Sequence, residues 1–207
     1  MHATGVLAHM NSLREGRWEG SGRTGGQPHG ELDGRVLGMF GFGHIGRAVA
    51  KRAEAFGMRI EAVTRRRGSL NDMLPHCDFF LIAAPLTAET RGRIGAAELA
   101  LLPRHAFLIN VGRAEIVCEG ALYEALKSNA IAGAALDVWY QYPGPGEHGH
   151  GSRFPFHMLP NVMCTPHYSA WTRPMILRRI ALMAENLQRL ARREPLDRVV
   201  LEGTWQG

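Results

Sequence analysis

Residues at three places in this sequence have types and spacings that could do chemistry. Gly41, Gly43 and Gly46 form the pattern G-x-G-x-x-G, and residues without a Cβ let the backbone bend sharply and approach a phosphate closely. Arg113 offers a planar cation that suits a carboxylate. His167 offers an imidazole, a group that titrates near neutral pH. Each residue type also serves purely structural roles, so its chemistry depends on the elements that position it.

The glycine pattern lies between a predicted strand and a predicted helix. The apolar run Val36–Phe40 precedes it and indicates a buried strand, and apolar residues at helical spacing follow it over 45–56. The first N–H groups of such a helix point back at the turn and carry partial positive charge, which favours a pyrophosphate. The flanking elements therefore favour a dinucleotide site over a turn that exists for conformational reasons alone.

The alternation of apolar strands with helices continues along the chain. Further strands are predicted over 59–64, 79–83, 107–110, 132–138 and 162–164. Helices are predicted over 70–74, 96–101 and 118–128, with a packed terminal helix over 173–193. Continuous apolar strands suit a sheet that is covered on both faces, and alternation with helices implies parallel pairing. We predict an α/β fold, a doubly wound parallel sheet of the Rossmann type in three layers, with ligands beyond the carboxyl ends of the strands.

Two regions lie outside this alternation. Residues 1–17 have apolar residues at helix-like spacing, and 20–30 is a glycine-rich, flexible connector. We predict that 1–30 forms a helix and arm whose exposed apolar face favours a homodimer, and that 31–207 forms the dinucleotide-binding domain with its C-terminal helix. Residues 140–160 are rich in glycine and proline, which predicts a long loop, and loops of this length are often functional.

Composition excludes several classes of function. The net charge is +5, but most lysines and arginines are scattered, so we predict no nucleic-acid partner. Three widely spaced cysteines argue against a disulfide framework and fit a reducing compartment. Cys164-x-x-His167 and His148-x-His150 lack a second pair at ligand spacing, so we predict no metal site. No apolar run approaches the roughly 18 residues of a membrane span, and 1–10 does not resemble a signal peptide, so we predict a cytoplasmic protein without a membrane partner.

The end of the second predicted strand carries the signal for the choice of cofactor. A fold that takes NAD usually has Asp or Glu there to hold the ribose hydroxyls. Here Thr64 ends the strand, 18 residues after Gly46, and Arg65, Arg66 and Arg67 follow. Hydroxyl and guanidinium groups suit a 2′-phosphate, because arginine offers bidentate charge-assisted bonds. We therefore predict NADP(H) in preference to NAD(H), bound through Thr64, Arg65 and Arg66. The alternative is a solvated basic turn.

The chain carries five longer motifs, in the order ELDGRVLGMFGFGHIGRAVAKRAEAFGMRI, LIAAPLTAETRGRIG, LINVGRAEIV, AGAALDVW and LPNVMCTPHYSAWT. Their order and spacing resemble the D-isomer-specific 2-hydroxyacid dehydrogenases over about 31–207. The resemblance implies an NAD(P)-dependent oxidoreductase that transfers hydride between the cofactor and a small 2-keto or 2-hydroxy acid. It also implies that Arg113 binds the substrate carboxylate and polarises its carbonyl. His167 would protonate the carbonyl oxygen as the hydride arrives.

The same resemblance implies a set of cofactor contacts. The pyrophosphate would be bound by the turn residues Gly41, Gly43, His44, Ile45 and Gly46. The nicotinamide side would be lined by Ala84, Pro85, Val111 and Gly112. The carboxamide would be bonded by Asp137 and Ser169, and Thr90 would be a further contact.

One catalytic position departs from the family pattern. The family has a glutamate, usually followed by proline, five residues after the Asp of the LDV motif, where it holds the proton of the histidine. Here Tyr142 stands at that place, with Gln141 before it and Pro143 after it. The Tyr142 hydroxyl or Gln141 could supply a neutral hydrogen bond instead, so Tyr142 is counted with the catalytic candidates. Ala114, where glycine is common in the family, is a smaller departure.

The other departure concerns extent. The N-terminal substrate domain of the family has no counterpart in this sequence, so we expect a truncated form that binds the dinucleotide and is weakly active alone. Two alternative functions stay open. A dinucleotide-sensing, corepressor-like interaction protein would use the same fold without chemistry. A formate dehydrogenase-like enzyme would use Gln141, which lies one place out of register.

Overall fold

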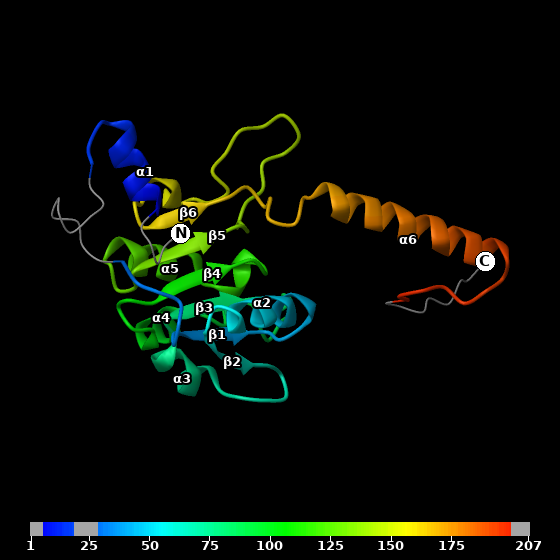
Figure 1. Ribbon diagram of the computed structural model, residues 1–207, viewed down its shortest axis with the longest axis horizontal. Coiled ribbons are helices and arrows are strands. Elements are labelled where there is room, and N and C mark those ends of the chain that lie inside the picture. The colour runs from blue at the N-terminus through cyan, green and yellow to red at the C-terminus, as the bar shows by residue number, and fades with distance from the viewer. Residues whose placement is uncertain (1–5, 19–28, 200–207) are drawn as a thin grey trace. The chain divides into compact units, whose positions relative to one another are not determined.

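The structure is a computed structural model that describes residues 6–18 and 29–199, and it contains a six-stranded parallel sheet (Figure 1). Its strands are β1 (Val36–Phe40), β2 (Arg59–Val63), β3 (Phe79–Ile82), β4 (Phe107–Asn110), β5 (Gly133–Leu136) and β6 (Val162–Cys164). They lie in the order β2-β1-β3-β4-β5-β6, and each neighbouring pair is parallel. The predicted doubly wound α/β sheet is confirmed.

Within the described residues, the strands are accompanied by the helices α1 (Val6–Arg14), α2 (His44–Glu54), α3 (Leu70–Met73), α4 (Ala96–Leu101), α5 (Glu119–Lys127) and α6 (Arg173–Ala191). Short 3₁₀ helices are η2 (Leu74–His76), η3 (Ala114–Ile116) and η4 (Phe156–Met158). From β1 onward, the predicted ranges agree with these bounds to within two residues at each end. β5 is shorter than predicted because its neighbour β6 ends at Cys164, opposite Leu136, and the ladder between them stops there.

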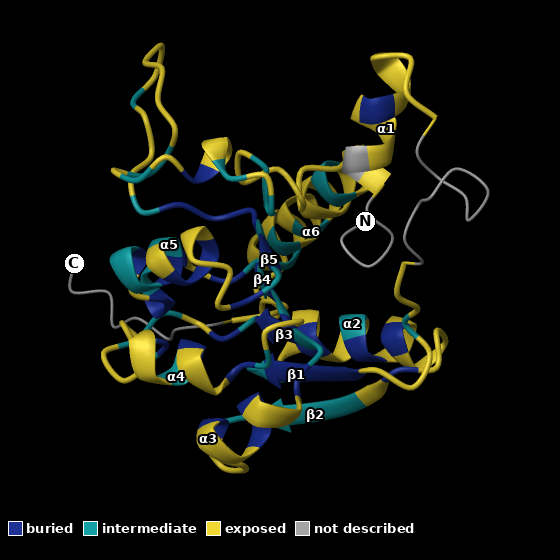
Figure 2. Ribbon diagram, turned by 90° about the vertical axis from the view of Figure 1, so that its left-hand side faces the viewer, coloured by how far each residue is buried: buried dark blue, intermediate teal, exposed yellow. Residues whose placement is uncertain are grey.

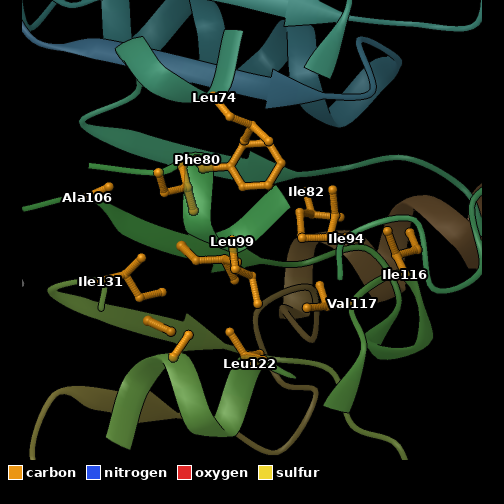
Figure 3. Packing of buried hydrophobic residues seen from close by; sticks show 14 of the residues in the cluster. Leu74, Phe80, Ile82, Ile94, Leu99, Ala106, Ile116, Val117, Leu122 and Ile131 are labelled. Carbon is orange, nitrogen blue, oxygen red and sulfur yellow. The ribbon is translucent and has the colours of Figure 1, made fainter. Parts of the chain in front are cut away.

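The sheet buries apolar side chains on both faces. Phe80 and Ile82 of β3 belong to a core cluster with residues of α3, α4 and α5, whereas Leu81 between them packs with residues of α2. Successive strand residues point to opposite faces, so these two clusters mark the two sides of the sheet. Figure 3 shows the larger cluster, in which Leu99 lies between Phe80 and Leu122. In Figure 2, β1 is buried while the edge strand β2 is only partly covered.

The chain changes direction across the sheet between β1 and β3. β2 lies on one side of β1 and β3 on the other, so the loops that follow β1 and β3 diverge and leave a crevice at the carboxyl ends of the strands. Arg113 follows β4, Asp137 follows β5, and His167 comes three residues after β6 ends. Because parallel strands end at one edge of a sheet, the predicted site residues share the edge that carries this crevice.

A carboxylate fixes the opposite edge of the sheet. Asp78, just before β3, accepts the backbone N–H of Val36 at 2.7 Å and the guanidinium of Arg35 at 2.9 Å. The ring nitrogen Nε2 of His105 lies 3.0 Å from the same carboxylate. Partial burial acts to raise the pKa of Asp78, but the bonds to Val36, Arg35 and His105 outweigh it and lower the pKa overall.

The chain separates into two compact units, residues 1–167 and 168–207. The second unit holds α6, which begins after Thr172, whose hydroxyl accepts the backbone N–H of Met175 at 3.3 Å. None of the residues of α6 is buried, so the predicted packing of the terminal helix finds no partner among the described residues of that unit. The part of the chain that the structure describes has no helix long and apolar enough to cross a membrane.

The first helix exposes apolar side chains. Val6, Met10 and Leu13 of α1 have exposed fractions of 38%, 42% and 57%. The helix ends at Arg14, and Gly16 adopts a φ of +76°, as expected of a glycine that follows a helix end. The predicted glycine-rich connector falls almost wholly in 19–28, outside the described residues.

Candidate functional site

The glycine turn after β1 is shaped by the backbone around it. Gly41 has a φ of +99°, and a Cβ there would lie 2.5 Å from the backbone nitrogen of Ala84. A Cβ on Gly46 would lie 2.7 Å from the carbonyl oxygen of Gly41. At Gly43, by contrast, a Cβ would meet no atom of the described residues within 4 Å. Packing inside the protein therefore explains the first and third glycines of the motif, but not the second.

The open side of Gly43 adjoins the start of α2. Gly43 is the N-cap residue of this helix and has no side chain with which to accept a backbone N–H. Helix geometry leaves the N–H groups of the first turn, at His44, Ile45 and Gly46, without partners inside the helix. These groups carry the positive end of the helix dipole, which suits an anion.

A cavity of about 670 Å³ opens beside the glycine turn, at the point where the strand order reverses. Its volume is typical of sites for small molecules and cofactors. The predicted residues that line it are Gly41, Gly43, Thr64, Arg65, Ala84, Pro85 and Thr90. Lining residues that the sequence did not suggest include Ser69, Glu89 and Arg93.

The end of this cavity at β2 is basic. Backbone bonds of 2.8 and 3.3 Å join Thr64 to Arg67 and hold the two arginines between them at the tip of a tight turn. Arg65 lines the cavity. Arg66 is exposed, and its backbone N–H donates to the Thr64 hydroxyl at 3.3 Å. A helix N-terminus beside the open Gly43, together with the Arg65 cation in the cavity lining, fits the charges of a phosphorylated dinucleotide.

Two side chains after β3 shape the wall of the same cavity. The Thr90 hydroxyl donates to the carbonyl of Pro85 at 2.8 Å and accepts the N–H of Thr87 at 2.7 Å, so it holds its own turn closed. The Thr87 hydroxyl donates to Glu89 at 2.6 Å. This bond, and more weakly the charge of Arg65, lower the pKa of Glu89 and keep it a carboxylate. No local sequence pattern indicated that this carboxylate would share a cavity with Arg65.

Arg113 stands on a turn directly after β4. The side chain of Asn110, the last residue of β4, accepts the N–H of Gly112 at 3.1 Å and donates to the carbonyl of Arg113 at 3.1 Å. The Arg113 guanidinium is exposed and donates to the carbonyl of Gly112 at 2.8 Å. The sequence pointed to Arg113 but not to Asn110, whose side chain spans the turn that carries the arginine.

His167 and Tyr142 are in contact. The Tyr142 hydroxyl lies 3.0 Å from Nδ1 of His167, and the two ring centroids are 5.6 Å apart. The same hydroxyl accepts the backbone N–H of Trp139 at 3.2 Å. His167 has a φ of +55°, a conformation that is uncommon outside glycine and is concentrated at functional sites. Of the two neighbours considered from the sequence, Tyr142 is the one whose side chain meets the histidine.

Thr165 ties the segment before His167 to the end of β5. Its hydroxyl donates to Asp137 at 2.6 Å, and its backbone N–H donates to the carbonyl of Leu136 at 2.9 Å. The indole N–H of Trp139 donates to the Thr165 carbonyl at 2.8 Å. These bonds fix the histidine segment to buried Asp137, which is 5% exposed.

Hydrogen bonds hold the loop that carries Tyr142 at two places: at its neck, where residues 140–141 meet Gly151, and at residues 152–153. The N–H groups of Tyr140 and Gln141 both donate to the carbonyl of Gly151, at 3.0 and 2.9 Å. Glu119 of α5 then accepts the hydroxyl of Ser152 at 2.8 Å and the guanidinium of Arg153 at 2.7 Å. The long loop predicted from the sequence is therefore ordered around its neck, where Tyr142 lies.

A second cavity, of about 370 Å³, lies against this loop and is lined by Tyr142, Gln141 and Cys164 among others. The rings of His150 and His157 stack beside it with centroids 3.7 Å apart. Burial raises the pKa of the Cys164 thiol to about 11. No three His, Cys, Asp or Glu side chains gather as a metal site within the described residues.

Two of the residues predicted to line the nicotinamide side, Val111 and Gly112, follow β4. The Val111 N–H donates to the carbonyl of Ile82 at 3.3 Å, beside the loop of Ala84. Ser169 belongs to the second unit, so its role stays a prediction.

Comparison with known proteins decides the family. Residues 1–169 match the family described as D-isomer specific 2-hydroxyacid dehydrogenase, NAD binding domain. The chain belongs to this family. The glyoxylate reductase of Aeropyrum pernix is 41% identical to it over 169 residues, which are 76% of this chain and 49% of that protein. The D-3-phosphoglycerate dehydrogenase of Methanocaldococcus jannaschii is 35% identical over 202 residues, covering 91% of this chain and 36% of that protein.

Solved structures of D-isomer specific 2-hydroxyacid dehydrogenases agree with the fold. The enzyme of this family from Xanthobacter autotrophicus Py2, solved in complex with NADPH and MES, superposes with a TM-score of 0.75 at 30% identity. That match covers 95% of this chain and 80% of the other. The chain spans about half the length of the curated glyoxylate reductases it matches, 49% and 54% in two of them.

Proposed function

We propose that this chain binds NADP(H) at the glycine turn and takes part in the reversible reduction of a small 2-keto acid, such as glyoxylate or hydroxypyruvate. The observation that carries the proposal is the cavity of about 670 Å³, which is lined by both the open backbone of Gly43 and Arg65. Family membership and relatives named as glyoxylate reductases support the reaction class. The bound nicotinamide supplies the hydride in the reducing direction.

The preference for NADP(H) rests on the turn after β2. Arg65 is the cation that lines the cavity there, and Thr64 adds a hydroxyl. Glu89 lines the same cavity and acts in the opposite direction, because a carboxylate repels a phosphate and attracts Arg65. The arginine outweighs the carboxylate in this proposal, since the 2′-phosphate carries more charge and forms bidentate bonds with a guanidinium.

Arg113 and His167 are proposed to act on different groups of the substrate. The Arg113 guanidinium binds the carboxylate of the keto acid and polarises the adjacent carbonyl, because a fixed planar cation matches both groups. His167 holds the proton that the carbonyl oxygen takes up. Asp137 supports the histidine segment through Thr165 and is proposed to bond the carboxamide of the cofactor, together with Ser169.

Tyr142 sets the hydrogen positions on His167. The Tyr142 hydroxyl accepts the N–H of Trp139, and we propose that it donates its own hydrogen to Nδ1 of the histidine. A neutral His167 then carries its hydrogen on Nε2, the nitrogen that faces away from Tyr142 along the ring. A glutamate at this position accepts hydrogen bonds only, so it would place the hydrogen on Nδ1 instead.

The assembly proposal rests on α1. Its exposed Val6, Met10 and Leu13 support a homodimer formed through the arm 1–30, with 31–207 as the dinucleotide-binding domain. The three free cysteines support a reducing, cytoplasmic location. Sedimentation of the wild-type chain as a monomer at 50 µM would remove the dimer from the proposal, where ~50 µM exceeds the Kd of most stable dimers.

The test of the cofactor assignment is a pair of titrations, with NADPH and with NADH, on wild type and Arg65→Ala. Losing a charge-assisted contact costs about 1.5–3 kcal/mol, so NADPH affinity should fall about 10- to 100-fold while NADH affinity stays within about twofold. Arg67→Ala is the matched control, since Arg67 lies in the same turn but does not line the cavity. Equal losses for both cofactors, or tighter binding of NADH by wild type, would refute the preference.

The test of the reaction is cofactor oxidation. NADPH consumption that depends on glyoxylate or hydroxypyruvate, and that Arg113→Ala abolishes, supports the dehydrogenase. Cofactor binding without turnover of any 2-keto acid would favour a dinucleotide-sensing protein instead.

A further inference from the structure

We propose that Asn110 is the positioning residue of Arg113, and that it sets where the substrate carboxylate is held relative to the cofactor cavity. The inference rests on the proposed function, because it assigns Arg113 to the carboxylate. The observation behind it is the pair of bonds from the Asn110 side chain to both sides of the turn that carries Arg113.

Asn110 is itself held rigidly. It is the last residue of β4, with Ile82 of β3 opposite on one side and Leu136 of β5 on the other. Its carbonyl accepts the N–H of Asp137 at 3.1 Å, and the residue is 2% exposed. A buried amide held at the end of an interior strand gives the next residues a fixed reference point.

The turn formed by the residues after Asn110 is held by both the oxygen and the nitrogen of the Asn110 side-chain amide. The side-chain oxygen accepts the buried N–H of Gly112, and the side-chain nitrogen donates to the carbonyl of Arg113. The Arg113 carbonyl also accepts the N–H of Ile116 at 3.3 Å, so donors hold it from two directions. The turn uses an acceptor and a donor on two separate atoms of one side chain. Ionised Asp lacks the donor, Ala lacks both, and Ser carries both on a single oxygen.

The turn that carries Arg113 packs against the chain segment that lines the large cavity. A Cβ on Gly112 would lie 3.1 Å from the carbonyl oxygen of Ala84 and 3.2 Å from that of Ile82. The turn is thus packed against the loop after β3, where Ala84 also lines the large cavity. Asn110 therefore couples the arginine to the side of the cavity where the nicotinamide is proposed to lie.

The first test needs no activity. Amide hydrogen exchange of Gly112 should show protection in the native chain, and Asn110→Ala should raise its exchange rate about tenfold or more, because a buried donor loses its acceptor. Asn161→Ala is the matched control, since Asn161 donates to the carbonyl of Leu126 at 3.1 Å in another part of the chain. Native exchange at Gly112 without protection, or equal effects of both variants, overturns the proposal.

The second test measures carboxylate binding, with oxamate titrated into the chain saturated with NADPH. Asn110→Ala should weaken oxamate binding at least about fivefold while NADPH affinity changes less than about twofold, and Asn110→Asp, which keeps the acceptor, should lie between. In an Arg113→Lys background the same change should cost less than about twofold, because the two residues act as one unit. Additive losses overturn the proposal. A native chain that binds NADPH but no oxamate defeats the proposed function alone, and the exchange data still decide the role of Asn110.

Discussion

The contact between Tyr142 and His167 makes a prediction that can be checked atom by atom. The Tyr142 hydroxyl accepts the N–H of Trp139 at 3.2 Å, and we propose that its own hydrogen is donated to Nδ1 of His167 at 3.0 Å, so that neutral His167 carries its hydrogen on Nε2. Tyr142→Phe removes this preference. Tyr142→Glu reverses it, because a carboxylate accepts the hydrogen from Nδ1.

The magnitude follows from the hydrogen bond that is lost. A neutral hydrogen bond contributes about 0.5–1.5 kcal/mol net, which corresponds to an about 2- to 13-fold bias between the two ring tautomers. Tyr142 is 54% exposed, so water competes for the hydroxyl and the bias should lie in the lower part of that range.

The assay is long-range ¹H–¹⁵N correlation of the histidine ring at about pH 9, well above the ordinary histidine pKa of about 6.5. We expect the nitrogen shifts of His167 to report hydrogen on Nε2 in wild type, a mixture in Tyr142→Phe, and hydrogen on Nδ1 in Tyr142→Glu. Identical His167 shifts in wild type and Tyr142→Phe would refute the reasoning, whatever the activity of either protein.

Two further predictions concern groups outside the site. The lowered pKa of Asp78 stabilises the fold above the ordinary aspartate pKa of about 3.9, and this stabilisation is lost as the pH falls through the lower, folded value. Asp78→Asn should therefore lower the free energy of unfolding by about 1–3 kcal/mol at pH 7, with the difference shrinking below about pH 4 in urea titrations; a difference that does not depend on pH would contradict this. For the thiols, burial raises the pKa of Cys77 to about 12 and that of Cys164 to about 11, whereas Cys118 is exposed. A thiol reagent at pH 8 should modify Cys118 first, the half-buried Cys164 more slowly and the buried Cys77 only on unfolding, which mass spectrometry of Cys118→Ser can check.

The sequence was sufficient for the fold because its signals are local. The apolar runs at Val36–Phe40 and Phe107–Asn110 are the bounds of β1 and β4 in the structure. The glycine spacing likewise located the turn beside the large cavity. A periodic apolar pattern and a glycine-rich turn each consist of residues close together in the sequence, so these elements can be predicted without knowledge of distant contacts.

The parts that the sequence did not indicate depend on residues far apart in the chain. Glu89 shares a cavity with Arg65, 24 positions earlier, only because β1 lies between β2 and β3. Tyr142, and not Gln141, contacts His167 in the structure. The loop that carries Tyr142 is held by bonds from the N–H groups of Tyr140 and Gln141 to the carbonyl of Gly151, a contact between residues about ten positions apart that no local pattern predicts. The structure adds nothing to the formate dehydrogenase alternative, since Gln141 lines the second cavity and Tyr142 meets the histidine.

The most direct test of the account is NADPH binding to Gly43→Ala. A methyl group at Gly43 meets no atom of the described residues within 4 Å but stands at the wall of the large cavity, so the fold should be unchanged while the cofactor is obstructed. Gly149→Ala is the matched control, because within 4 Å its Cβ would meet, among the described residues, only Pro143, at 3.9 Å. We predict that fluorescence titration will show NADPH binding to wild type and Gly149→Ala, and binding at least about tenfold weaker to Gly43→Ala at an unchanged melting temperature. Equal NADPH affinity in all three, or a folded wild-type chain that binds neither NADPH nor NADH, would contradict the account.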